Sequence, residues 1–228
     1  MKLAELLEIR PGVTAVTGGG GKTTLLRILG EELAAAGHTV LLCATTKIYP
    51  FPGLENLEDP GEQALKRALS SRRPVCAGTS VPGTGKLTAP SLPMARLAEL
   101  ADYVLAEADG SAGRPFKAHA AHEPVVPREA NQIVTVAGAS GFGRPVREAV
   151  HRPELFGFLT ELEPEDPVTP EAVAEALQTE ASTAWPLIRV FVNQVEDEAA
   201  MIAASRLAER LPWPVLAGSL RKGEYWRC

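Results

Sequence analysis

The chain has 228 residues, of which 45% are hydrophobic and 22% are charged, and its formal net charge at pH 7 is −5. This composition is typical of a soluble globular protein and excludes disordered, collagen-like and disulfide-scaffold chains. The acidic balance argues against nucleic acid as a partner, because binding a phosphate backbone requires clustered Lys and Arg. A single glycine-rich loop could still bind a small anion locally.

The cysteines and the N-terminal sequence indicate the compartment. Cys43, Cys76 and Cys228 are scattered and form no C-x-x-C pair, which favours a reducing environment over a metal or redox motif. Cys43 lies in an apolar run, so we expect it to be a small buried hydrophobic residue. The acidic N-terminus does not resemble a signal peptide, and no apolar run approaches the roughly 18 residues of a membrane span. We therefore expect a cytoplasmic protein without a membrane partner.

Short apolar runs alternate along the chain with amphipathic segments. This alternation predicts an α/β protein, with a mostly parallel central sheet covered on both faces by helices, as in the three-layer P-loop NTPase-like fold. In chain order we expect a strand at Val13–Val16, a helix at Thr23–Ala36, a strand at Thr39–Ala44, a helix at Glu62–Leu69, a strand at Pro74–Gly78, a hairpin turn at Pro82–Gly85, a helix at Leu92–Leu100, a strand at Tyr103–Glu107, a loop from Gly110 to about Arg128, a strand at Gln132–Ala137, short helices near Pro153–Leu159 and Pro170–Leu177, a strand at Leu187–Val192, a helix at Glu198–Arg210 and a strand at Val215–Ala217.

The strongest motif is the segment Thr17–Thr24, which reads T-G-G-G-G-K-T-T between an expected strand and an expected helix. Its glycines let backbone N–H groups converge on phosphate oxygens, and the helix N-terminus adds a positive end. Lys22 would span the β- and γ-phosphates, Thr23 would bind Mg²⁺, and Thr24 would help cap the helix and contribute to nucleotide binding. Val16 stands where the strict P-loop has glycine, so the alternative is a glycine-rich turn with an incidental lysine. The phosphate-binding glycines are Gly18, Gly19, Gly20 and Gly21.

An acidic segment follows the strand expected at Tyr103–Glu107. Side chains alternate along an extended chain, so Glu107 and Asp109 share one side of it. We expect one carboxylate to bind Mg²⁺, directly or through water, and the other to orient water. Gly110 could offer its N–H to a γ-phosphate. The alternative is a solvated strand end.

The segment after the strand at Leu187–Val192 is a candidate for base recognition. It reads N-Q-V-E and resembles the N-K-x-D segment with which GTPases bind guanine, where the acid pairs with the base and Asn braces the loop. Asn193 and Glu196 would take these roles, although Gln194 replaces Lys and Glu replaces Asp. The nucleotide is therefore ATP or GTP, with Mg²⁺.

Two further loops carry candidate substrate residues. The loop after the second expected strand contains Thr46 and Lys47, which could serve metal or substrate or could form only a turn. The Gly110–Arg128 loop contains Arg114 and Lys117, which we expect to contact an anionic substrate. His119, His122 and Glu123 in this loop could hold a metal, although no periodicity predicts a helix to position them.

Several segments together carry a family resemblance. They are Thr17–Thr24, Thr45–Lys47, E-A-D-G-S at 107–111, Lys117, E-P-V-V-P at 123–127, G-R-P at 143–145, V-H-R-P-E at 150–154 and N-Q-V at 193–195. In this order they resemble the YqeC-like family of accessory proteins of selenium-dependent molybdenum hydroxylases. The resemblance implies a role in maturation of these enzymes, with a hydroxylase or its cofactor-maturation enzymes as partners. His151 and Arg152 of this pattern would face a second, anionic substrate.

Three hypotheses follow for the activity. The first is an NTPase or NTP-dependent transferase in which Lys22, Glu107 and Asp109 are catalytic and Thr23, Glu107 and Asp109 hold the metal. The second is an ATP-dependent amide ligase, because the glycine loop also resembles that of Mur ligases. The third is a nucleotide-gated, metallochaperone-like switch with little turnover of its own.

The spacing of the motifs bears on the number of domains. The phosphate loop, the acidic segment and the base loop lie near residues 20, 107 and 193, so one nucleotide site would draw on nearly the whole chain. We therefore expect a single nucleotide-binding domain over residues 1–228. The segment Glu161–Pro170 has four acids and three prolines and is the best candidate for a linker, within a possible insertion around 138–182. Its alternative is an exposed acidic connection.

Overall fold

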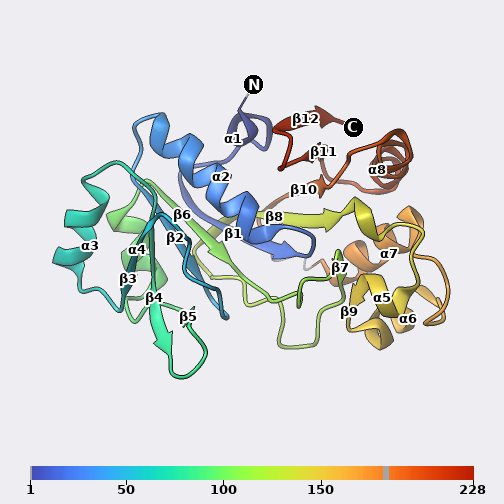
Figure 1. Ribbon diagram of the computed structural model, residues 1–228, viewed down its shortest axis with the longest axis horizontal. Coiled ribbons are helices and arrows are strands. Elements are labelled where there is room, and N and C mark those ends of the chain that lie inside the picture. Colours follow the sequence, from blue (N-terminus) through green and yellow to red (C-terminus); the bar gives the residue numbers. More distant parts are fainter. Residues whose placement is uncertain (1, 182–184) are drawn as a thin grey trace. The chain divides into compact units, whose positions relative to one another are not determined.

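The computed structural model describes residues 2–181 and 185–228. The fold is mixed α/β, with a large, mostly parallel sheet flanked by helices, which confirms the predicted class (Figure 1). The chain forms two compact units. The first unit comprises Met1–Val16, Thr23–Gly110 and Val125–Ile133, and the second comprises Thr17–Lys22, Ser111–Pro124 and Val134–Cys228. The expectation of a single domain over 1–228 stays a prediction.

The sheet of the first unit is built from parallel neighbours. Its order is β1-β6-β2-β4-β3, and β5 extends it as an antiparallel hairpin with β4. Buried strands with near-continuous apolar sequence are typical of parallel sheets covered on both faces. Its strands are β1 (Gly12–Gly18), which ends in the second unit, β2 (Val40–Ala44), β3 (Glu55–Glu58), β4 (Val75–Val81), β5 (Lys86–Thr88) and β6 (Tyr103–Glu107).

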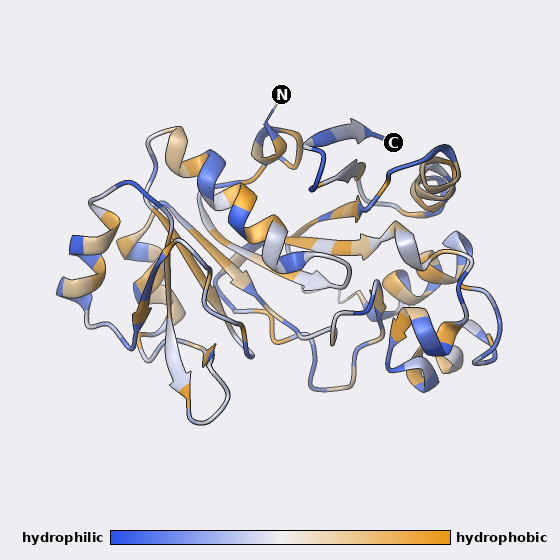
Figure 2. Ribbon diagram, viewed as in Figure 1, coloured by the Kyte–Doolittle hydropathy of each residue, from blue (hydrophilic) through white to orange (hydrophobic). Residues whose placement is uncertain are grey.

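Helices of the first unit cover this sheet. They are α1 (Leu3–Leu6), α2 (Lys22–Ala35), α3 (Glu62–Leu69) and α4 (Met94–Leu100). Leu65 and Leu69 of α3 and Leu97 of α4 pack on the strands in one buried cluster, while the other side of α3 is polar. Figure 2 shows this contrast between the hydrophobic strand β6 and the hydrophilic residues along α3. The cluster confirms that Cys43 is a buried apolar residue, and burial raises the pKa of its thiol to about 12.

The second unit has its own strands and helices. Strand β8 (Ala130–Gly138) ends in it, and the order β8-β10-β11-β12 continues with β10 (Leu187–Asn193), β11 (Val215–Ser219) and β12 (Glu224–Arg227). A two-stranded sheet joins β7 (Phe116–Lys117) and β9 (Val150–His151). Helix α7 packs against α6 and α8. The helices are η1 (Ala139–Gly141), α5 (Val146–Ala149), α6 (Pro153–Thr160), α7 (Pro170–Glu180) and α8 (Glu198–Arg210).

Most expected elements are present, and those that sequence analysis missed are short or lie at sheet edges. The bounds of α3, α8 and β6 are those predicted, and the predicted turn at Pro82–Gly85 closes the β4–β5 hairpin. Strands β3 and β12 are four-residue edge strands, too short for a periodic pattern, so their pairing with a neighbour identifies them as strands.

The acidic segment Glu161–Pro170 is largely exposed, and its backbone is hydrogen-bonded to a neighbouring segment. Its backbone exchanges hydrogen bonds with the segment 143–147, including Val168 N–H to the Arg144 carbonyl at 2.9 Å and Val146 N–H to the Asp166 carbonyl at 3.0 Å.

None of the described helices combines the length and apolar character that a transmembrane span requires.

Candidate functional site

The glycine loop joins the end of β1 to the start of α2. Gly18, Gly20 and Gly21 have φ angles of +88°, +81° and +130°, which L side chains rarely adopt. A Cβ atom added to any of the four glycines would lie only 2.2–2.5 Å from a neighbouring atom of the second unit. The loop therefore requires glycine at every one of these positions, for steric reasons as well as for its backbone conformation.

Two of the glycine N–H groups anchor the loop. Gly19 N–H donates to the Val136 carbonyl at 2.9 Å, and Gly20 N–H donates to the Arg114 carbonyl at 3.0 Å. These two groups are thus engaged by protein, and the expectation that loop amides bind phosphate stays a prediction. By helix geometry, the first four N–H groups of α2 have no acceptor inside the helix. The capacity to bind an anion therefore lies at the start of α2.

Lys22 folds back over the loop. Its Nζ donates to the Gly18 carbonyl at 2.6 Å, and the residue is only 4% exposed. The bond holds the ammonium group of Lys22 beside the glycine loop.

Two of the residues expected to bind the metal, Thr23 and Glu107, contact each other within the first unit. Thr23 Oγ1 donates to Glu107 Oε2 at 3.0 Å, although the two residues are 84 positions apart in the sequence. Glu107 ends β6 at 7% exposure, Asp109 is completely buried two residues later, and Gly110 is exposed. A hydroxyl and a carboxylate side by side are the oxygen ligands that Mg²⁺ prefers.

The loop after β2 lies beside this acidic segment. Thr45 N–H donates to the Glu107 carbonyl at 2.9 Å, and Thr45 Oγ1 donates to the Val125 carbonyl at 2.8 Å. Among the described residues the buried Thr46 Oγ1 has no hydrogen-bond partner, so this hydroxyl has bonding capacity left for a ligand or water. Lys47 is exposed.

Asn193 connects three loops of the second unit. Its Nδ2 donates to the Gly20 carbonyl at 2.7 Å, and its Oδ1 accepts from the Leu220 N–H at 3.0 Å. The side chain is buried, so both bonds are shielded from water. Through the bond to Gly20, Asn193 holds the end of β10 against the glycine loop.

Glu196 lies three residues beyond Asn193 and contacts the turn after β11. Its carboxylate accepts from Ser219 Oγ at 3.2 Å and from Nε and Nη2 of Arg221, with the Nε bond at 3.1 Å. Gln194, at the position of the missing lysine, instead accepts from Ser140 Oγ at 2.6 Å. Ser219 and Arg221 were not among the predicted site residues, although β10 and β11 are consecutive parallel strands whose carboxyl ends meet at one edge.

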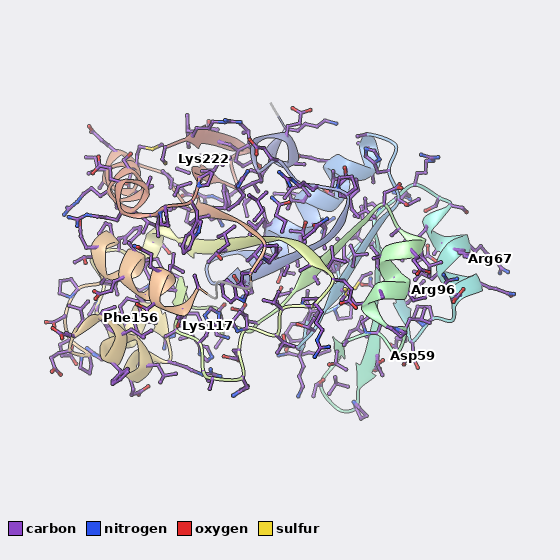
Figure 3. The ribbon with its side chains drawn as sticks, turned by 180° about the vertical axis from the view of Figure 1, so that it is seen from behind. Asp59, Arg67, Arg96, Lys117, Phe156 and Lys222 are labelled. Carbon is purple, nitrogen blue, oxygen red and sulfur yellow. The ribbon has the colours of Figure 1, made fainter. Side chains whose placement is uncertain are left out.

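Two of the expected substrate residues of the second unit, Lys117 and Arg152, contact the carboxylate of Glu123. Lys117 on β7 is opposite His151 on β9, and Lys117 Nζ lies 3.0 Å from Glu123 Oε2. Arg152 Nη1 also donates to Glu123. Burial disfavours the charge of Glu123, but the hydrogen bonds and charges of the two cations outweigh it and lower the pKa of this carboxyl. Figure 3 labels Lys117 on its strand.

Two other predicted residues have structural partners. The guanidinium of exposed Arg114 donates to the Glu148 carbonyl. The ring and N–H of His119 bond the two carboxylate oxygens of Glu180, each at 2.6 Å, so His119 does not join His122 and Glu123. Over residues 2–181 and 185–228, no group of three or more His, Cys, Asp or Glu side chains is placed to hold a metal ion.

Comparisons with known proteins agree with the resemblance seen in the sequence. A family model described as "YqeC protein" matches residues 14–154, which include the glycine loop, the acidic segment and the Lys117–Arg152 cluster. The chain is 33% identical over 162 residues to "Uncharacterized protein YqeC" of Escherichia coli (strain K12). That match covers 68% of this chain and 63% of the relative, so the chain spans less than two thirds of the relative's length.

Proposed function

The chain belongs to the YqeC family, and from this premise we propose that it is a Mg²⁺-dependent nucleotide-binding protein that acts as an NTPase or NTP-dependent transferase. The observation that carries the proposal is the glycine loop, in which no position tolerates a Cβ and a nearly buried lysine lies over the loop. A turn that merely joined a strand to a helix would need neither feature.

The roles of the residues follow from their chemistry. The first N–H groups of α2 would bind phosphate oxygens, and Lys22 would exchange the Gly18 carbonyl for a phosphate oxygen. Thr23, which follows Lys22 directly in the chain, and Glu107 would hold the magnesium ion. When bound, Mg²⁺ would neutralise charge on the phosphates. Asp109, buried beyond Glu107, would orient the attacking water or acceptor group.

The Lys117, His151 and Arg152 cluster supports a second, anionic substrate. The cluster holds two cations around the single carboxylate of Glu123. An anionic substrate that binds the guanidinium of Arg152 would compete with the carboxylate of Glu123 for that guanidinium. Together with the family resemblance, this supports a role in maturation of selenium-dependent molybdenum hydroxylases, with the second substrate coming from that pathway.

The proposal is tested by calorimetric titration of the protein with ATP, GTP and CTP, each with Mg²⁺. We expect at least one nucleotide to bind, and we expect Lys22→Ala to weaken that binding by about 10- to 100-fold, since a charged hydrogen bond contributes about 1.5–3 kcal/mol. Lys66→Ala is the matched control, because Lys66 is an exposed lysine on α3. Equal affinities for wild type and Lys22→Ala, or no binding of any nucleotide, would refute the proposal.

Phosphate release distinguishes an enzyme from a slow switch. We expect wild type to release phosphate from its preferred nucleotide and Lys22→Ala to release none above background, in the presence of extract containing the partner. Equal release from both proteins would show that the loop is not the catalytic site.

A further inference from the structure

Glu196 and Arg221 form a bidentate ion pair at the turn after β11. Nε and Nη2 of Arg221 donate to the two different carboxylate oxygens of Glu196, the fork arrangement typical of guanidinium and carboxylate. The Arg221 side chain is 76% exposed, whereas that of Glu196 is 34% exposed. The carboxylate is thus held in place while its cationic partner lies at the surface, where another donor can replace it.

Fixed groups orient this carboxylate. Ser219, only 1% exposed, donates its hydroxyl to Glu196 Oε1, and Lys222 Nζ donates to the Glu196 backbone carbonyl at 3.1 Å. The N–H of Lys222 bonds Ser219 Oγ at 3.2 Å, which closes the turn on the serine. Figure 3 labels Lys222 beside the strands of this unit. The serine hydroxyl therefore orients one oxygen of the Glu196 carboxylate, and Lys222 contacts the Glu196 backbone.

The carboxylate also lies within reach of the glycine loop. Asn193 bonds both the Gly20 carbonyl and the Leu220 N–H, and Leu220 is flanked by Ser219 and Arg221. Glu196 follows Asn193 by three residues, so their Cα atoms are at most about 11 Å apart. All of these residues belong to the second unit. A ligand whose phosphates lie at the loop could thus extend to Glu196.

The bidentate geometry of the Arg221–Glu196 pair indicates which donors a ligand needs in order to replace Arg221. Guanine presents N1–H and N2–H as two parallel donors on one edge, as the guanidinium of Arg221 does, whereas the corresponding edge of adenine presents one donor and one acceptor. We infer that Glu196 is the recognition residue of a guanine subsite, from which the incoming base displaces Arg221. This inference rests on the proposed nucleotide-binding function and assigns its base.

The test is calorimetric binding of GDP, ADP and XDP with Mg²⁺ to wild type and Glu196→Gln. We expect wild type to bind GDP about 10- to 100-fold more tightly than ADP. Xanthine replaces the second donor of guanine by a carbonyl, and the amide of Gln supplies one acceptor and one donor. Glu196→Gln should therefore lose the preference for GDP, bind XDP at least tenfold more tightly than wild type does, and keep the wild-type affinity for ADP, which shows that the fold and phosphate site are intact.

A second pair of variants tests displacement of the arginine. Arg221→Ala should bind GDP about two- to fivefold more tightly than wild type, since an exposed ion pair contributes up to about 1 kcal/mol. Arg206→Ala is the matched control, because Arg206 forms a similar surface pair with Glu171 and should leave GDP affinity unchanged.

The outcomes separate this inference from the proposed function. Equal affinity of wild type for GDP and ADP, or a Glu196→Gln variant that still prefers GDP over XDP, overturns the guanine subsite while nucleotide binding stands. Failure of wild type to bind any of the nucleotides overturns both.

Discussion

Asn193 donates a hydrogen bond from its Nδ2 to the backbone carbonyl of Gly20, at 2.7 Å, across a sequence separation of 173 residues. The bond ties the end of β10 to the glycine loop. The same side chain accepts a bond from Leu220, so one buried amide contacts both the glycine loop and the turn that contacts Glu196.

Replacing Asn193 by Ala should lower the free energy of unfolding by about 1–3 kcal/mol, because it leaves the buried Gly20 carbonyl and Leu220 N–H without this partner. Nucleotide affinity should fall as well. Asn131→Ala is the control, since exposed Asn131 also donates to a backbone carbonyl, that of Pro11, and should change stability by only about 0.5 kcal/mol. Urea unfolding of the two variants measures the difference, and equal stabilities would contradict the bracing role.

Gly20→Ala and Gly83→Ala separate steric conflict from backbone strain. Both glycines have similar positive φ angles, +81° and +74°, so either substitution should cost about 1–2 kcal/mol of strain. A Cβ on Gly83 meets nothing within 4 Å, whereas one on Gly20 would lie 2.5 Å from the Cα of Gly138. We expect Gly20→Ala to be the less stable variant in urea unfolding and to lose nucleotide binding, while Gly83→Ala keeps it. Similar behaviour of both would argue against a close-packed loop.

Thr23→Ala should remove the magnesium dependence of nucleotide binding. Thr23 donates to Glu107, whereas Thr24, also exposed, is the threonine at the next position of α2 and is the matched control. We expect Thr23→Ala to weaken binding in Mg²⁺ to the affinity that wild type has in EDTA, and Thr24→Ala to retain the response to Mg²⁺. Titrations with and without the metal decide this, and a full Mg²⁺ response in Thr23→Ala would exclude Thr23 as a ligand.

Glu123 should make stability depend on pH in the acidic range. Its pKa is lowered, because the bonds and charges of Lys117 and Arg152 outweigh the opposing effect of burial. A carboxyl with a lowered folded pKa stabilises the fold above its unfolded pKa of about 4.3, and this contribution is lost as the pH falls through the folded pKa. Glu123→Gln should therefore be about 1–3 kcal/mol less stable than wild type at pH 7, with a difference that shrinks as the pH falls below about 4.

The control for this prediction is Glu165→Gln, which removes the partner of Arg147 in a pair whose carboxylate side chain is 70% exposed. Surface pairs contribute about 0–1 kcal/mol, so this variant should differ little from wild type. Denaturant unfolding from pH 3 to pH 8 compares the three proteins. A Glu123→Gln deficit that stays constant down to pH 3 would contradict the ion-pair explanation.

Local sequence pattern was sufficient to predict the elements with strong apolar periodicity. Helices α3 and α8 have an apolar face and defined ends, and β6 is a continuous apolar run before acidic residues, so local preferences agree with burial. Strand β12 has no such pattern, and its backbone pairing with β11 alone makes it a strand. The same limit applies to Arg221, which becomes a site candidate only because β10 and β11 are neighbours.

The sequence by itself determined the chemistry of this protein's candidate site, because glycines followed by Lys-Thr, and acids after an apolar strand, are residue types whose capacity to bind phosphate and magnesium is local. It could not determine which groups meet. Only the tertiary structure decided that Thr23 pairs with Glu107, that Asn193 bonds Gly20, that Glu196 faces Arg221 and that His119 pairs with Glu180 instead of with His122. The physical reason is that these contacts span 25 to 173 residues and depend on which strands are neighbours in the sheet, which no local preference specifies.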